Sequence, residues 1–347
     1  MKQRDSNIEL LRIVATLFIL IVHCNGWLLT FGEPPIEWDF GGPMVSISRV
    51  LIQNITAIGV NLFILISGFY GIHPKISSIV NLFTCLLFFY CGSFLLNCGL
   101  GYEEFTIKHF IKSLMAFSHE NWFINCYLFL ILLSPIINVF VENMSKRNML
   151  IYICVFMICA FYFGCIINSK YFYFNEGYSV TMMIIVYIVG HYIKRYLSDR
   201  IDMIKYKKIV FVYIISLLFM IGSFIVQQYI EVPIHTYCSP FYIFSAVCMF
   251  LLFYRIPKFY NPIVNWFGKS CLAAYILHTS SPFVHWLASL DYELITTDNY
   301  GIYMVKMLGV VLVLFVASIL LDKVRILIFY PLQKWIIQKE KNILLLH

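Results

Sequence analysis

Apolar segments of about twenty residues recur along the whole chain, and they limit the possible folds more than any other feature. A segment of that length, coiled as a helix, crosses the hydrocarbon core of a bilayer. Of the 347 residues, 61% are hydrophobic and 12% are charged, whereas a soluble domain has about 25% charged residues. The sequence therefore predicts an all-α, polytopic membrane protein.

We expect about ten transmembrane helices, which form one integral membrane domain over residues 1–347. The predicted spans are residues 9–30, 49–71, 76–98, 121–141, 148–168, 178–193, 208–229, 239–256, 269–289 and 302–321. The first span lacks a small-residue cleavage pattern, so we interpret it as a membrane helix and not as a signal peptide. Residues 322–347 mix bulky apolar and basic side chains, which favours an amphipathic tail at the cytoplasmic face.

Basic residues gather in alternate loops between the predicted spans. They are Lys2, Arg4, Lys75, Lys146, Arg147, Lys194, Arg195, Arg200, Lys205, Lys207, Lys208, Arg255, Lys258, Lys323, Arg325, Lys334, Lys339 and Lys341. The remaining loops are acidic or nearly neutral, so the positive-inside rule places both termini in the cytoplasm. This pattern accounts for the net charge of +7, so we expect membrane lipids as partners and no nucleic acid.

Cysteine and histidine are numerous but scattered. The chain has 11 cysteines and 9 histidines, with no CxxC pair and no HExxH cluster. The pattern favours small buried hydrophobic cysteines over disulfides or metal ligands. We expect no metal site and no permanently bound cofactor.

The first span, NIELLRIVATLFILIVHC, carries three ionisable side chains. Arg12 and His23 are eleven residues apart, which is about three helical turns, so they share a face and lie about 16 Å apart along the axis. Glu9 precedes Arg12 by one turn, where it can pair with the guanidinium. Arg12 could be an interfacial anchor, and His23 could be a polar contact between helices. Ionisable residues at depth more often mark a functional pathway.

The chemistry of these two side chains suits a long ligand with a charged end. An arginine can hold a phosphate at the membrane surface, and a histidine about 16 Å deeper can move a proton at the far end of the ligand. A nucleotide thioester with an extended arm fits that spacing. We therefore expect Arg12 and His23 to line one continuous cavity.

The same residues resemble a known family. Arg12, ten residues and His23 match the R-x10-H signature of acyltransferase family 3, and three further segments resemble its motifs in order. These are GVNLFILISGFYGI (60–73), ENWFINCYLFLILLSPIIN (120–138) and GKSCLAAYILH (268–278). The resemblance implies a bacterial inner-membrane enzyme that moves an acyl group, by resemblance acetyl, from cytoplasmic acyl-CoA to a hydroxyl. The implied acceptor is a cell-surface or lipid-linked glycan.

Several other residues are candidates for this chemistry. Where the family commonly carries a basic pair near the third span, this chain has His73 and Lys75. Lys75 is a possible phosphate contact of acyl-CoA, or a topology charge. We expect Arg12 to bind the donor and His23 to act as general base, although an acyl-histidine intermediate is an open alternative.

The fourth and ninth spans supply the remaining candidates. Glu120 could orient the imidazole of His23, or simply suit a helix N-terminus. Trp122 could stack on a sugar or anchor the interface, and Asn125 could donate to an oxyanion. The supporting or acceptor-binding candidates are Glu9, Asn121, Trp122, Asn125, Tyr275 and His278.

Two other classes of protein remain compatible with the residues alone. A transporter of glycan or lipid intermediates could also use buried arginine and histidine, although no repeat symmetry is evident. A membrane sensor or assembly subunit would tolerate changes at both positions. Acyl transfer by the purified protein separates the enzyme from both.

Overall fold

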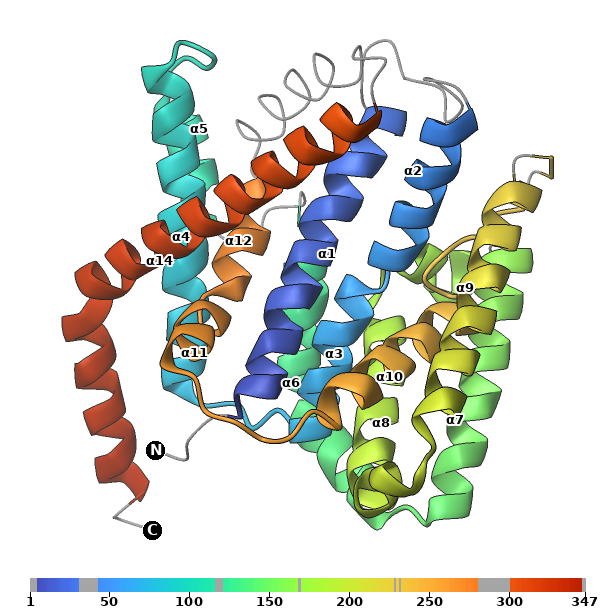
Figure 1. Cartoon of the computed structure of the whole chain (residues 1–347). Coiled ribbons are helices and arrows are strands. Elements are labelled where there is room, and N and C mark those ends of the chain that lie inside the picture. The colour runs from blue at the N-terminus through green and yellow to red at the C-terminus, as the bar shows by residue number, and fades with distance from the viewer. Residues whose placement is uncertain are drawn as a thin grey trace. The chain divides into compact units, whose positions relative to one another are not determined.

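A computed structural model describes residues 5–30, 43–115, 121–167, 170–227, 229–230, 232–279 and 300–344. In this part of the chain every regular element is helical (Figure 1). Eight helical segments are long and apolar enough to cross a membrane. The all-α, polytopic fold expected from the sequence is thus confirmed.

Most predicted spans correspond to helices. The structure has α1 (Ser6–Thr30), α2 (Pro43–Thr56), α3 (Gly59–Tyr70), α4 (Ile76–Gly99), α6 (Trp122–Asn143), α7 (Lys146–Phe161), α8 (Val180–Tyr192), α9 (Tyr206–Gln227), α10 (Pro240–Tyr254) and α14 (Tyr300–Leu344). The second predicted span is therefore two consecutive helices. Ala57 and Ile58 separate them, and α3 begins at Gly59, where a Cβ atom would lie 2.8 Å from the carbonyl oxygen of Ala15.

Two predicted spans are shorter in the described part. Helix α10 has 15 residues, fewer than the roughly 20 that cross a bilayer without thinning it. Helix α12 (Cys271–His278) begins the ninth predicted span, 269–289, which continues into residues outside the described part. A count of ten spans therefore stays a prediction.

Helix α14 continues well past residue 321, where the last predicted span ends. It is one helix of 45 residues and includes most of the predicted tail. Its ribbon bends in Figure 1, and it contains Pro331, which cannot donate the usual backbone hydrogen bond and kinks a helix.

The chain divides into two compact units. The first contains Met1–Val22, Ser46–His73 and Trp122–Gly268, and the second contains His23–Val45, Pro74–Asn121 and Lys269–His347. Helix α1 supplies residues to both.

In the first unit, α3 packs on α8 and α10, α8 packs on α6 and α7, and α9 packs on α10. Glycines allow the closest of these approaches. A Cβ on Gly68 would lie 2.1 Å from the carbonyl oxygen of Tyr187, and a Cβ on Gly190 would lie 2.5 Å from that of Leu65. The backbones of α3 and α8 are therefore in direct contact, as small residues permit in membrane helices.

A hydrogen-bond network holds the C-terminal end of α3 to α6 and α8. The hydroxyl of Tyr187 donates to Asn138 Oδ1 (2.8 Å) and accepts from the backbone N–H of Ile72 (2.7 Å). Asn138 donates in turn to the carbonyl oxygen of Ile72 (3.0 Å). These bonds satisfy polar groups that would be costly to leave unpaired in an apolar setting.

In the second unit, α12 packs on α4 and α14, which also pack on each other. A buried ion pair lies at the contact between α4 and α14. Arg325 Nε donates to Asp322 Oδ1 (2.7 Å), and Arg325 Nη1 donates to Asn81 Oδ1 (3.0 Å) and Thr84 Oγ1 (3.1 Å). Both charged residues are 3% exposed.

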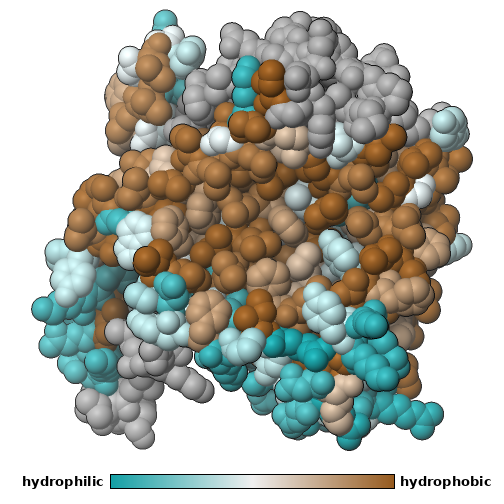
Figure 2. All heavy atoms as spheres, viewed as in Figure 1, coloured by the Kyte–Doolittle hydropathy of each residue, from teal (hydrophilic) through white to brown (hydrophobic). Residues whose placement is uncertain are grey.

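The outward helix faces are strongly apolar. Large side chains of α7 and α9 are exposed, among them Ile158 (68%), Phe211 (63%) and Leu218 (61%). Figure 2 shows hydrophobic side chains over the helices and hydrophilic ones gathered near helix ends. The short α5 (Ile107–Leu114) buries none of its residues, as an interfacial amphipathic helix would. These surfaces suit contact with lipid.

Candidate active site

Two histidines from opposite ends of the sequence meet in the second unit. Nδ1 of His23, on α1, lies 2.7 Å from Nε2 of His278, on α12. Their ring centroids are 4.8 Å apart. His278 is buried, at 1% exposure, whereas His23 is partly exposed. The contact joins residues 255 positions apart.

The hydrogen bonds determine which nitrogen carries each proton. His278 Nδ1 lies 2.9 Å from the carbonyl oxygen of Ala274, and a carbonyl can only accept, so His278 Nδ1 donates. A neutral His278 then accepts at Nε2, and His23 Nδ1 must be the donor. This arrangement leaves the basic electron pair of a neutral His23 on Nε2, which is the tautomer that a general base needs.

Helix α12 holds His278 in place from both ends. Before the helix, Ser270 Oγ accepts a hydrogen bond from Lys323 Nζ of α14 (2.7 Å). Ala273 and Ala274, at 1% and 0% exposure, are small enough for neighbouring helices to approach closely. The ring of Tyr275 packs edge-on against His278, with centroids 5.4 Å apart.

Asn121 supports the same helix from its C-terminal end. Its side-chain Nδ2 donates to Thr279 Oγ1 (2.9 Å), and Thr279 directly follows His278. Asn121 is 3% exposed. Asn121 therefore lies beside the histidine pair and contacts it through Thr279, a residue that the sequence did not single out.

Arg12 and Glu9 form the ion pair that their spacing predicts. Arg12 Nη1 lies 3.3 Å from Glu9 Oε1, and their side chains are 27% and 4% exposed. Glu9 packs against Gly268, where a Cβ would lie 2.9 Å from the Glu9 Cβ. A buried carboxylate thus contacts Nη1 of an arginine whose side chain is itself partly exposed.

The other predicted residues lie elsewhere on the chain. Lys75 is exposed and immediately precedes α4. Trp122 and Asn125 are on α6 in the first unit, and the Trp122 ring contacts Tyr178 with centroids 4.9 Å apart. Glu120 lies outside the described residues.

Sequence reasoning missed the role of Arg325, which it counted as a loop charge. The spacing of Asp322 and Arg325, one turn apart, was the available signal. Another missed residue is Arg49, which is fully buried on α2 at 1% exposure. Among the described residues, no group of three or more potential metal ligands comes together.

Comparison with known proteins gives one match. A family model described as an acyltransferase domain matches residues 5–322, which include both histidines, Arg12 and the buried Asp322. No curated protein and no solved structure matches the chain.

Proposed function

Because the chain belongs to the acyltransferase 3 family and is therefore an acyltransferase, we propose that it moves an acyl group from acyl-CoA to a hydroxyl of a glycan. The proposed acceptor is a cell-surface or lipid-linked glycan. The acyl group proposed is acetyl. The single observation that carries the chemistry is the hydrogen bond between His23 and His278. The family membership supports this proposal over a transporter.

In the proposed step, His23 Nε2 takes the proton of the acceptor hydroxyl. The hydroxyl oxygen attacks the thioester carbonyl carbon, the carbon–sulfur bond breaks, and the CoA thiolate leaves with the proton returned by His23. The products are an ester and free CoA. His278 is a positioning residue here, because it touches no reacting atom and fixes the tautomer of His23.

The donor end of the proposal rests on Arg12 and Lys75. Arginine presents five N–H donors in a planar fork, and the contact with Glu9 uses Nη1 of Arg12. The Arg12 side chain is 27% exposed, which suits it to donate to phosphate oxygens of CoA. Lys75 supplies a second, exposed cation at the start of α4.

The orientation of the chain belongs to the same proposal. The basic loops face the cytoplasm, where acyl-CoA is found, and both termini lie on that side. The membrane proposed is the bacterial inner membrane. Trp122, Tyr178 and Tyr237, whose rings contact one another, then lie on the extracytoplasmic side, where aromatic faces suit a sugar ring.

The experiment uses full-length protein purified into lipid nanodiscs, with acetyl-labelled acetyl-CoA and surface glycan from the producing cells. His23→Ala should lower kcat by roughly 10²–10⁴-fold, the usual contribution of a general base, with little change in the KM for acetyl-CoA. Arg12→Ala should instead raise that KM.

His109→Ala is the matched control, because His109 is on the exposed helix α5 and its side chain contacts Glu103, which is no part of the proposed site. It should transfer at the wild-type rate. Undiminished transfer by His23→Ala, at equal membrane levels, would rule out the proposed base. Label retained on the protein when glycan is omitted, and lost in His23→Ala, would replace direct transfer with an acyl-histidine intermediate.

A further inference from the structure

Two buried cysteines from distant parts of the sequence meet in the first unit. Cys165 is in a short π-helical turn, Tyr162–Ile166, that continues α7, and Cys238 lies two residues before α10. They are 0% and 1% exposed. Cys165 Sγ lies 3.0 Å from Thr236 Oγ1, two residues before Cys238, and both cysteines are free thiols in the structure.

The chain segments themselves, and not only the side chains, are close at this point. A Cβ on Gly164 would lie 2.6 Å from the sulfur of Cys238 and 3.2 Å from its Cβ. Gly177 has a φ of +97°, and a Cβ there would lie 2.3 Å from the Tyr237 Cβ. Residues 237 and 238 are thus pressed against two glycines, which holds the sulfurs together.

Both cysteines lie at helix ends remote from the basic loops. Helix α7 begins with Lys146 and Arg147 and reaches Cys165 at its other end. Helix α9 begins beside Lys207 and Lys208, and Cys238 follows its other end. In the proposed orientation both thiols therefore face the extracytoplasmic compartment, where disulfides form and persist.

We propose that Cys165 and Cys238 form a disulfide in the mature protein. The proposal rests on the orientation given above and goes beyond the acyl transfer. Each thiol loses its proton, one sulfur–sulfur bond forms, and the two electrons reduce a protein disulfide of the extracytoplasmic compartment to a dithiol by thiol–disulfide exchange. The disulfide forms while the loop between α9 and α10 is folding, before the two cysteines are buried.

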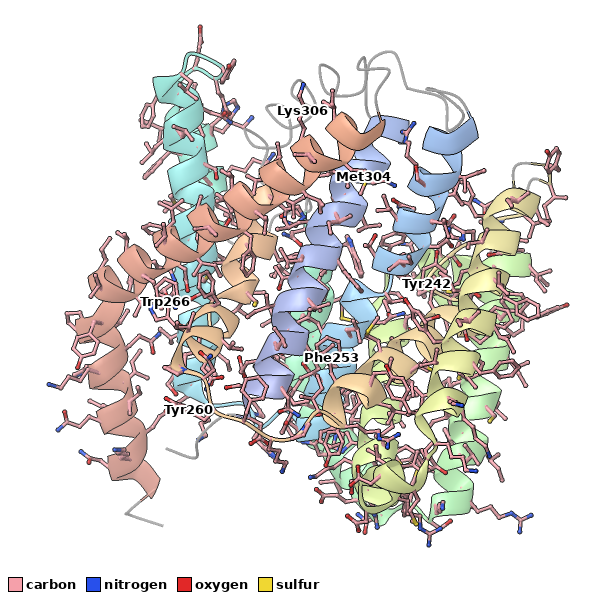
Figure 3. The ribbon with its side chains drawn as sticks, in the orientation of Figure 1. Tyr242, Phe253, Tyr260, Trp266, Met304 and Lys306 are labelled. Carbon is pink, nitrogen blue, oxygen red and sulfur yellow. The ribbon has the colours of Figure 1, made fainter. Side chains whose placement is uncertain are left out.

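The bond would fasten the loop between α9 and α10 to the end of α7. That loop carries Tyr237, which contacts Trp122 and Tyr178, and His235, whose Nε2 lies 2.9 Å from the hydroxyl of Tyr242. Tyr242 is on α10 and is labelled in Figure 3. Burial lowers the pKa of His235 to about 4, so this histidine is neutral and packed. The disulfide thus fixes an aromatic cluster on the proposed acceptor side.

The test is a thiol map of the full-length protein, purified from cells in the presence of N-ethylmaleimide and denatured before proteolysis. Mass spectrometry should find the Cys165 and Cys238 peptides joined and the other nine cysteines of the eleven alkylated. After reduction all eleven should react. Both thiols alkylated in unreduced protein, or either one joined to another cysteine, would overturn the proposal.

Two variants sharpen the result. Cys238→Ser should release Cys165 for alkylation and lower the apparent Tm by roughly 5–10 °C. Cys248→Ser, which changes another buried cysteine on α10, should leave the cross-link intact. An unchanged peptide map in Cys238→Ser would contradict the pairing. Since the map needs no acyl transfer, loss of the proposed function and loss of the disulfide are separate outcomes.

Discussion

At the scale of single residues, the backbone carbonyl of Ala274 decides how His23 can react. It fixes the proton on His278 Nδ1, and His278 then fixes the proton on His23 Nδ1. A neutral imidazole donates once, so the basic nitrogen of a neutral His23 in this arrangement is Nε2. The chemistry proposed for His23 depends on this short chain of hydrogen bonds.

Changing His278 should therefore separate positioning from catalysis. His278→Gln keeps an oxygen that can accept from His23 Nδ1, whereas His278→Leu removes the acceptor at similar size. We expect kcat to fall about tenfold or more in the leucine variant and less in the glutamine variant, with the KM for acetyl-CoA unchanged in both. Equal kcat values for the two variants would argue against the tautomer role.

The sequence predicted some of these residues but not their contact. The eleven-residue spacing of Arg12 and His23 needs only helix geometry, and the Glu9–Arg12 pair follows from adjacent turns. His23 and His278 meet because α1 and α12 fold together, and nothing local in the sequence encodes a contact over 255 positions. The same reason hid the proximity of Cys238 to Gly164, the neighbour of Cys165, on which the proposed disulfide rests.

At the scale of helices, the contact between α3 and α8 depends on two glycines. At Gly190 a Cβ would lie 2.5 Å and 2.7 Å from the backbone atoms Leu65 O and Phe69 N. Backbone cannot move aside as a flexible side chain can, so an added methyl must separate the helices.

Gly190→Ala should accordingly reduce the yield of folded protein and lower its apparent Tm by several degrees, as overpacking of about 1–3 kcal/mol predicts. Gly222→Ala is the matched control, since in the described part of the chain no heavy atom beyond its own helix backbone and chain neighbours lies within 4 Å of a Cβ at that position of α9. Size-exclusion profiles and thermal unfolding of both variants give the comparison. A Gly190→Ala protein as stable as the control would refute direct backbone contact.

The contact between α4 and α14 depends on a buried charge pair. Removing one partner leaves the other charge buried and unpaired, which typically costs about 3–5 kcal/mol, whereas replacing both with apolar residues is often neutral. We expect Arg325→Met to lower the apparent Tm more than the double variant Asp322→Leu/Arg325→Met does. Thermal unfolding of detergent-solubilised protein gives the comparison. A larger loss of Tm in the double variant would mean that the pair is not buried between α4 and α14.

Helix bounds show which features of the fold a local sequence pattern can and cannot predict. Apolar runs predicted most helices within a few residues, because hydrophobic length is a local property. The break at Gly59 and the extension of α14 to Leu344 depend on neighbours. Gly59 packs against α1. Arg325 can remain buried on α14 because Asn81 and Thr84 of α4 accept hydrogen bonds from its guanidinium.

For the whole molecule, the distribution of basic residues among the loops predicts how the chain is oriented in the membrane. We expect green fluorescent protein fused after His347 to fluoresce and alkaline phosphatase fused there to be inactive, because the positive-inside rule keeps the C-terminus in the cytoplasm. Phosphatase inserted after Tyr229, in the loop between α9 and α10, should be active. The opposite pattern would invert the chain and place Cys165 and Cys238 in a reducing compartment.

The proposed catalysis requires His23 and His278 to act as one unit, and a double-mutant cycle that measures kcat for acyl transfer is the decisive experiment. If His278 acts only through His23, the variant His23→Ala/His278→Leu should be no slower than His23→Ala alone. If instead the two losses multiply, or His23→Ala retains wild-type kcat, then the histidine pair is not the catalytic unit.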